Sequence, residues 1–291
     1  MATTKIIPDL TALNKADTTK SLKMPSGGGF SGTATEGMLR NDTSQSSQSS
    51  ASTMQFYNGT DWKNFVNSPL CTTTTCSFPT GPTAVALFQM ESSSVTDTCG
   101  NFSLAALNNM TFTSGKFGNA ATFNGTDSRI DITGQMPSDT TSDYAISAWV
   151  KADALGSAGR VIFSNIGAGG STGTGQAAVY IWNSKLRLYI YNGANFHVYD
   201  GPSTLTTATW YNIVANIDIN AGTSTSLTAY INGSAETLSF IASTTITGNS
   251  SSQFGTAQSL HFWDGQIDQV RVYTSTISLS QAGELNTEIG C

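Results

Sequence analysis

The run AVYIWNSKLRLYIY, residues 178–191, contains two stretches in which aliphatic and aromatic side chains alternate. A period of two predicts β-strands at 178–182 and 186–191, followed by a turn at Asn192-Gly193. One side of these strands is filled by Val179, Ile181, Leu188 and Ile190, which leaves the other side to Tyr180, Trp182, Tyr189 and Tyr191. Because both sides are apolar or aromatic, we expect one face to pack on a core and the other to be covered by a partner or ligand.

Short strands continue on both sides of this run, with Gly- and Asn-containing turns between them. They are predicted at 84–88, 120–123, 128–132, 144–150, 161–164, 196–199, 210–218, 227–231 and 266–273. The composition agrees, because only 11% of the residues are charged, against about 25% in an ordinary soluble protein, and five Glu in 291 residues leave little material for helix surfaces. Many short strands at this spacing predict an all-β, two-sheet antiparallel sandwich.

Residues 1–67 differ from the rest of the chain. A polar tract at 41–50 precedes MQFYNGTDWKNF, residues 54–65, in which Asn58-Gly59 predicts the turn of a β-hairpin. A lone two-stranded hairpin is marginally stable in water, so we expect it to pack on the protein's own domain or on other subunits through Phe56, Tyr57, Trp62 and Phe65. We interpret residues 1–67 as an extended arm, 68–82 as a linker with three prolines, and 83–291 as the globular domain.

Three further stretches stand in a distinctive order. They are GKFGNAATFNGTD (residues 115–127), WYNI (210–213) leading to LTAYING (227–233), and FWDGQIDQVRVY (262–273). This order resembles the laminin-G-like, concanavalin A-like lectin/glucanase jelly roll, and ISLSQAGEL (277–285) is similar to the short terminal helix of that family. The resemblance covers about residues 84–288 and implies a jelly-roll fold, but it does not name a ligand.

The N-terminal part has a resemblance of its own. GMLRNDT (residues 37–43) followed by FYNGTDW (56–62) resembles segments of tailed-phage structural proteins. This implies that residues 1–67 dock on phage capsid or tail proteins, with the head displayed on the virion surface. A fibre role would further imply a homo-oligomer, usually a trimer.

Charge and hydropathy exclude several partners. The net charge of -6 and the 13 scattered Lys and Arg argue against nucleic acid and anionic membranes, which need a basic patch. No apolar run approaches the roughly 20 residues of a membrane span, and the first residues lack a signal-peptide core. We therefore expect synthesis in a host cytoplasm and release with the virion.

The four cysteines are Cys71, Cys76, Cys99 and Cys291. Their spacing and the distant histidines argue against zinc. A tight bridge between Cys71 and Cys76 would leave Cys99 and Cys291 as the second pair. Cytoplasmic synthesis opposes both bridges and later life outside the cell favours them.

The sequence bears on three kinds of site: a catalytic site, a glycan-binding site and a calcium site. Glucanases with this fold are similar to each other in a Glu-x-Asp-x-x-Glu strand, which is missing here, so we predict no catalytic residues and no enzyme activity. Crowded aromatic side chains favour glycan binding, or else simple core packing, at Tyr180, Trp182, Tyr189, Tyr191 and His197. The resemblance also implies calcium at Asp97 and Asp268, although Asp97-Thr98-Cys99-Gly100-Asn101 has Cys where relatives have Ser or Thr.

The sequence thus predicts a non-enzymatic virion surface protein, either a capsid decoration protein or a fibre. Its lectin-like head would bind host-surface polysaccharide. The alternative is a free carbohydrate-binding or adhesion module with no virion partner.

Overall fold

The computed structural model describes strands at 39–42, 53–57 and 62–64, and then residues 75–137, 142–157, 159–166, 176–218, 227–245, 252–257 and 259–288. The chain divides into two units, Met1–Pro69 and Leu70–Cys291. Among the residues in these ranges, no helix has the length and apolar character needed to cross a membrane.

The N-terminal unit contains a three-stranded antiparallel sheet of β1 (Leu39–Asp42), β2 (Thr53–Tyr57) and β3 (Trp62–Asn64). The predicted hairpin is confirmed, because β2 pairs with β3 and Tyr57 lies opposite Trp62. The pairing of β1 with β2 was not predicted. Of the four expected docking residues, Phe56, Tyr57 and Trp62 lie on strands, and Phe65 lies outside the described residues.

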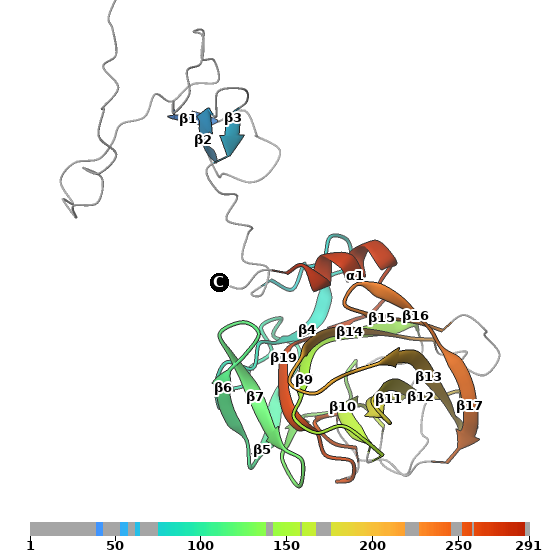
Figure 1. The fold of residues 1–291 in the computed structure, drawn as a ribbon. Coiled ribbons are helices and arrows are strands. Elements are labelled where there is room, and N and C mark those ends of the chain that lie inside the picture. Colours follow the sequence, from blue (N-terminus) through green and yellow to red (C-terminus); the bar gives the residue numbers. More distant parts are fainter. Residues whose placement is uncertain are drawn as a thin grey trace, which may run out of the picture. The chain divides into compact units, whose positions relative to one another are not determined.

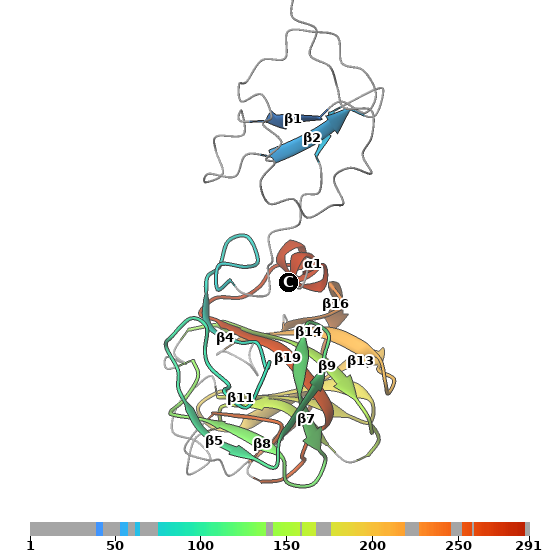
Figure 2. The same cartoon turned by 90° about the vertical axis from the view of Figure 1, so that its left-hand side faces the viewer.

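The C-terminal unit is a sandwich of two antiparallel sheets (Figure 1), which confirms the predicted fold class. Sheet I has the order β16-β15-β14-β9-β19-β7-β6, with β4 also paired to β19. Its strands are β4 (Ala84–Phe88), β6 (Thr111–Ser114), β7 (Asn119–Asn124), β9 (Tyr144–Ala152), β14 (Trp210–Ile217), β15 (Thr228–Ile231), β16 (Ser234–Thr237) and β19 (Asp264–Tyr273). Figure 2 shows β7, β9 and β19 in this sheet.

Sheet II has the order β17-β13-β12-β11-β10-β18-β8-β5. Its strands are β5 (Leu104–Asn108), β8 (Arg129–Ile132), β10 (Arg160–Ser164), β11 (Ala177–Trp182), β12 (Lys185–Tyr191), β13 (Phe196–Thr204), β17 (Ser239–Thr244) and β18 (Ser252–Phe254). The predicted alternation holds in β11 and β12, where the core contains Val179, Ile181, Leu188 and Ile190.

Aromatic rings join the two sheets inside the core. Phe254 of sheet II lies 5.3 Å from Phe88 of sheet I and 5.8 Å from Phe163 of its own sheet. Edge-to-face packing of this kind adds to the burial energy of the rings. The inner faces of both sheets are therefore closed, and any ligand must use an outer face, an edge or a loop.

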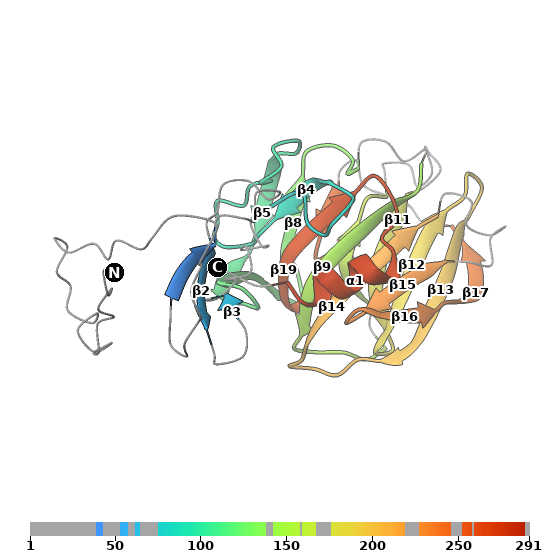
Figure 3. The same ribbon diagram turned by 90° about the horizontal axis from the view of Figure 1, so that it is seen from above.

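The outer face of sheet I is covered by α1 (Leu279–Asn286), which lies against β14 and β16 (Figures 1 and 3). The helix begins with a capping box, in which the Ser278 and Gln281 side chains each accept from the other's backbone N–H. Ala282 and Leu285 pack on Tyr230 and Tyr273. The short terminal helix expected from the family resemblance is thus present.

Of the predicted linker at 68–82, the structure describes residues 75–82. Residues 75–82 pack on the domain: Tyr273 donates from its hydroxyl to the Phe78 carbonyl at 2.8 Å, and Thr80 N–H donates to Glu284 Oε2 at 2.8 Å. Three prolines suggested a linker, but Phe78 supplies apolar surface that the helix side of the domain buries.

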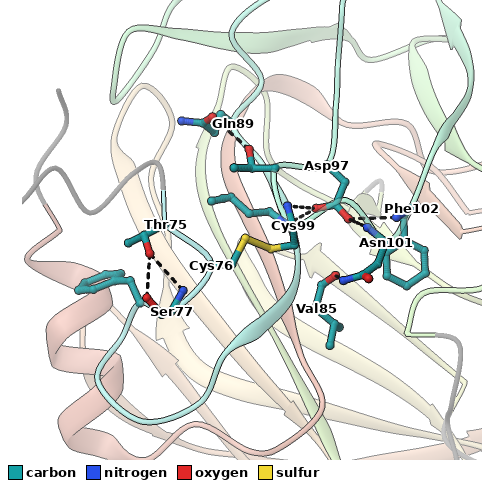
Figure 4. Close-up of a disulfide and its surroundings, with 12 residues drawn as sticks. Thr75, Cys76, Ser77, Val85, Gln89, Asp97, Cys99, Asn101 and Phe102 are labelled. Carbon is teal, nitrogen blue, oxygen red and sulfur yellow. Dashed lines mark hydrogen bonds between the residues drawn. A yellow bond between two sulfur atoms is a disulfide. The ribbon is translucent and has the colours of Figure 1, made fainter.

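The predicted disulfide pairing is wrong, because Cys76 is bonded to Cys99 (Figure 4). The carbonyl of Cys76 accepts from Ala84 N–H at 2.6 Å, and an isolated bridge joins Asp97 to Phe88 of the same β4 strand. Both cysteines are therefore brought to β4, which spacing along the chain does not reveal. Cys71 and Cys291 lie outside the described residues.

Candidate functional site

The outer face of sheet II carries a line of aromatic rings. Tyr180 lies opposite Arg187, and Trp182 opposite Lys185, so β11 and β12 present these side chains on one face. His261, in the loop between β18 and β19, lies 5.5 Å from Trp182 and 5.7 Å from Tyr180 between ring centroids. Tyr180 in turn lies 4.9 Å from Tyr189. We call Trp182, His261, Tyr180 and Tyr189 the aromatic run.

The members of the aromatic run differ in exposure. Tyr180 is only 4% exposed, whereas Trp182 and Tyr189 are half-buried and His261 is exposed. Ile166 and Ala257 pack with Tyr180 in one apolar cluster on this face. A ligand can therefore reach Trp182, His261 and Tyr189, whereas Tyr180 supports them from below.

An ion pair borders the aromatic run. Arg187 donates from Nε and Nη2 to the two carboxylate oxygens of Asp200, at 2.6 and 2.7 Å, and its guanidinium lies 4.9 Å from the Trp182 ring centroid. These hydrogen bonds raise the pKa of Arg187 above its ordinary value. The guanidinium therefore packs over the Trp182 ring, and the pair puts polar groups next to the part of the indole that remains exposed, which is the combination that a small-molecule site needs.

A glycine makes room for this arrangement. A side chain at Gly159 would place its Cβ 2.7 Å from the Trp182 ring and 3.0 Å from Nδ1 of His261. The backbone of residue 159 therefore lies directly against both rings. This close approach requires a residue without a side chain.

The five predicted glycan residues do not form one site. Tyr191 is 6% exposed and packs on Phe196 at 5.0 Å, so its ring does not face solvent. His197 lies opposite Ile190, on the other side of the sheet from the aromatic run. There it contacts Phe240 at 5.7 Å, near the sheet edge, and Phe240 is 55% exposed.

Sequence reasoning missed Arg187, Asp200 and His261. Arg187 was readable in principle, because it has the same parity on its strand as Tyr189 and Tyr191. Asp200 depends on the register between β12 and β13. His261 comes from a loop 79 positions after Trp182 and has a positive φ of 56°, and no local pattern places it.

The two residues predicted to bind calcium, Asp97 and Asp268, both accept hydrogen bonds from the backbone. Asp97 Oδ1 accepts from the N–H groups of Leu87 and Cys99 at 2.8 and 2.9 Å, and Oδ2 accepts from Asn101 and Phe102 at 2.9 and 3.0 Å (Figure 4). Backbone donors directed at both oxygens do not fit a cation in the same place. In the described ranges no group of three or more His, Cys, Asp or Glu is arranged to hold a metal.

Asp268 anchors the hairpin between β6 and β7. Its Oδ2 accepts from the N–H groups of Lys116 and Phe117 at 2.9 and 3.0 Å. The Phe117 ring stands edge-on to Trp149 at 5.9 Å, and the Lys116 ammonium lies 4.3 Å from the same indole. Burial raises the pKa of Asp268 to about 7, although these backbone hydrogen bonds oppose the rise.

The described glutamates are all engaged elsewhere. Glu91 accepts from Asn119 N–H, Glu236 from Ser203, Glu284 from Thr80 N–H, and Glu288 from the Trp149 indole N–H. Glu288 also pairs with Arg271 at 2.7 Å. None of these groups lies in the aromatic run.

Comparisons with known proteins agree with the fold. The model of the Concanavalin A-like lectin/glucanases superfamily matches residues 124–282, more than half of the chain. Domain 4 of an extracellular arabinanase from Geobacillus stearothermophilus, solved with arabinotriose, is 20% identical with a TM-score of 0.52, covering 70% of this chain and 98% of that one. A search of curated proteins found no match.

Toxin binding domains share the fold as well. The binding domain of Paraclostridial Mosquitocidal Protein 1 is 18% identical with a TM-score of 0.53, and that of botulinum neurotoxin serotype D is 13% identical with a TM-score of 0.50. Each alignment covers 70% of this chain, which spans about half of either toxin chain. At these identities the likeness describes the fold alone.

Proposed function

Since the chain belongs to the Concanavalin A-like lectin/glucanases superfamily, we propose that it is a non-catalytic carbohydrate-binding module whose ligand lies on the aromatic run. The single observation that carries the proposal is the accessible Trp182 and Tyr189 on the outer face of sheet II, bordered by the Arg187–Asp200 pair. The arabinanase domain, solved with arabinotriose, supports a sugar as the ligand class for this fold.

The chemistry of the site suits a sugar. The C–H faces of a sugar ring are apolar and pack on aromatic rings, while its hydroxyls need hydrogen-bond partners. Trp182 and His261 offer rings, and Asp200 and Arg187 offer an acceptor and donors beside them. Both requirements are met within one patch of sheet II.

The positions of the glutamates support a non-catalytic role. Retaining glycoside cleavage needs two carboxyl groups about 5 to 5.5 Å apart, one of them free to act as a nucleophile. Near the aromatic run, Asp200 is held by two hydrogen bonds from Arg187. The ion pair therefore fixes the orientation of this carboxylate, and its remaining lone pairs can accept hydrogen bonds from ligand hydroxyls.

Affinity gel electrophoresis of the full chain through a panel of neutral and acidic polysaccharides tests this function. We expect at least one polysaccharide to retard the protein and Trp182→Ala to reduce the retardation strongly. Phe240→Ala, which removes an exposed ring on the other side of sheet II, is the matched control and should be retarded like the original protein. No retardation by any polysaccharide, or retardation that Trp182→Ala leaves unchanged, would contradict the proposal.

We also propose that the N-terminal unit attaches this module to a phage particle, through capsid or tail proteins, so that the head lies on the virion surface. The similarity of residues 37–43 and 56–62 to phage structural segments supports this role. The three-stranded sheet of β1, β2 and β3 contains Phe56, Tyr57 and Trp62, three of the four residues expected to dock.

Gold-labelled antibody against residues 83–291, applied to purified particles, tests the attachment. Label on heads would indicate capsid decoration, and label at the tail tip would indicate host recognition. Protein found only free in the lysate would reject attachment and leave a soluble lectin. Particle-bound protein released by mild denaturant would also report its oligomeric state.

A further inference from the structure

The aromatic run follows the direction of strand β11. Trp182 and Tyr180 are two residues apart on β11, and Tyr189 of β12 lies opposite Ala178, two residues further along. At about 3.4 Å per residue in an antiparallel strand, Trp182 and the level of Ala178 are roughly 13 Å apart. The His261 ring lies 5.5 Å from Trp182 and 5.7 Å from Tyr180, in the Trp182 half of this interval.

The two accessible ends are too far apart for one sugar unit. Consecutive centroids in the run are separated by 5.5, 5.7 and 4.9 Å, close to the length of one sugar unit in a polysaccharide. A single unit on Trp182 therefore leaves Tyr189 uncovered. A chain of several units can contact Trp182, His261 and Tyr189 in turn while Tyr180 remains beneath.

The middle of the aromatic run is close to uncharged. Asp200 neutralises Arg187 through two hydrogen bonds, and packing of the otherwise exposed His261 ring against Trp182 and Tyr180 partly desolvates it and lowers its pKa, which favours the uncharged imidazole. Lys185 lies opposite Trp182, at one end of the run. An anionic chain would find no row of cations in this part of sheet II, whereas a neutral chain needs none.

We infer that the aromatic run binds a neutral oligosaccharide of three or more units, laid along β11 from Trp182 to Tyr189, and not a single terminal sugar. The inference rests on the proposed function and adds the length, direction and charge class of the ligand. His261 contributes a ring contact next to Trp182, and the Arg187 guanidinium packs over the Trp182 ring at one end.

Titration calorimetry with oligosaccharides of one to six units tests the inference, using fragments of whichever polysaccharide retards the protein. We expect affinity to rise at least tenfold from one unit to three and then to level off. Trp182→Ala and Tyr189→Ala should each weaken binding of the trimer about tenfold, as expected for loss of one aromatic contact. Tyr189→Phe keeps the ring and should bind as the original protein does, and Phe240→Ala again serves as the matched control.

The outcomes separate this inference from the proposed function. Equal affinity for one unit and for three, with Trp182→Ala harmful and Tyr189→Ala harmless, would overturn the extended site but leave glycan binding standing. Tighter binding of acidic fragments than of neutral ones would overturn the charge class. Absence of binding to every fragment and polysaccharide would instead overturn the proposed function. Near-ultraviolet circular dichroism of each variant checks that the fold is intact.

Discussion

The two outer faces of the sandwich are built from similar strands but differ in how far other parts of the chain cover them. On sheet I, α1 and residues 75–82 cover the face with apolar and charged side chains of the same chain. On sheet II, Trp182, His261 and Tyr189 remain accessible. Strands that are apolar on both sides need a second cover. Residues of the same chain cover sheet I, whereas part of the outer face of sheet II remains exposed.

Two charged side chains are fully buried beneath the residues that cover the outer face of sheet I. Arg271 and Glu288 form an ion pair at 2.7 Å, and both side chains are 0% exposed. The Trp149 indole donates to Glu288 at 2.5 Å, and the Arg271 guanidinium lies 5.5 Å from the Phe78 ring centroid. Burial raises the pKa of Glu288, although Arg271 opposes the rise. This pair connects β19 with the residues that follow α1.

Breaking this ion pair is the strongest expected perturbation of the covered face. Glu288→Ala leaves Arg271 as an uncompensated buried charge, which typically costs about 3 to 5 kcal/mol. We expect thermal denaturation to show a fall in melting temperature of about 10 °C, with glycan affinity per folded molecule unchanged. Glu284→Ala removes a carboxylate on α1 that accepts one exposed hydrogen bond and should lower the melting temperature far less. Equal losses in the two variants would show that the buried pair does not stabilise the cover.

The disulfide also stabilises the segment that covers sheet I. Removing the Cys76–Cys99 bond, which has a sequence separation of 23, should cost about 3 kcal/mol through the entropy gained by the unfolded chain. We expect the Cys76→Ser, Cys99→Ser double variant to unfold at lower urea and to be cut faster by protease within residues 75–82. Unchanged cleavage there would mean that Phe78 and Thr80 hold the segment without the bond.

Many strands could be predicted from the sequence, because apolar residues recur at every second position in them. The strands with one core side, such as Ala177–Trp182 and Lys185–Tyr191, were predicted almost to the residue. The missed strands include Leu104–Asn108 and Ser239–Thr244, the two edges of sheet II, where most side chains are exposed or only half-buried and no apolar period arises. Alternation of apolar and polar residues in the sequence indicates a strand with one buried side. Edge strands have few buried side chains, so the alternation is missing there.

The site was less readable, because it combines distant segments. Trp182 and Tyr189 follow from strand parity, but His261 reaches them from a loop and Asp200 through the register of another strand. His197 was grouped with them by proximity in sequence, yet the register places it on the opposite side of the sheet. Residues within twenty positions of each other share a face only when the pairing between strands allows it.

Asp268, on the outer face of sheet I, makes the stability of the protein depend on pH. Its pKa is raised to about 7 by burial, against about 3.9 in an unfolded chain. Between about pH 4 and pH 7 the folded state therefore holds a proton that the unfolded state has lost, so stability falls as pH rises through this window. Asp268→Asn retains an acceptor for Lys116 and Phe117 but cannot ionise.

We expect Asp268→Asn to gain stability relative to the original protein as the pH is raised from 4.5 to 7.5, by about 3 kcal/mol. Melting temperatures of both proteins across this range give the measurement. Glu288 retains its own raised pKa in both, so its effect cancels in the comparison. A difference that does not vary with pH would show that Asp268 is ionised throughout.

One tryptophan on the outer face of each sheet allows a direct comparison of the two faces. Trp149 on sheet I is 3% exposed, and Trp149→Ala should cost about 3 to 5 kcal/mol. Trp182 on sheet II is half-buried, and Trp182→Ala should cost about 1 kcal/mol or less of stability while weakening glycan binding about tenfold. Calorimetric unfolding of the two variants measures both. A large stability loss in Trp182→Ala would show that the Trp182 ring is part of the packed structure. The exposed part of sheet II would then be smaller than we infer.

The smallest expected effect is that of calcium. A cation bound only to the folded state stabilises it in proportion to its saturation, so a calcium site would raise the melting temperature measurably at millimolar calcium. Asp97, next to the disulfide on the covered side, already accepts from four backbone N–H groups, and these donors would face the cation. We therefore expect the same melting temperature with calcium and with chelator, and a clear loss in Asp97→Ala, which leaves the four donors without their acceptor. A shift of several degrees on adding calcium, absent in Asp97→Ala, would instead mean that the loop rearranges around a metal, and the cover of sheet I would then depend on an ion as well as on the chain itself.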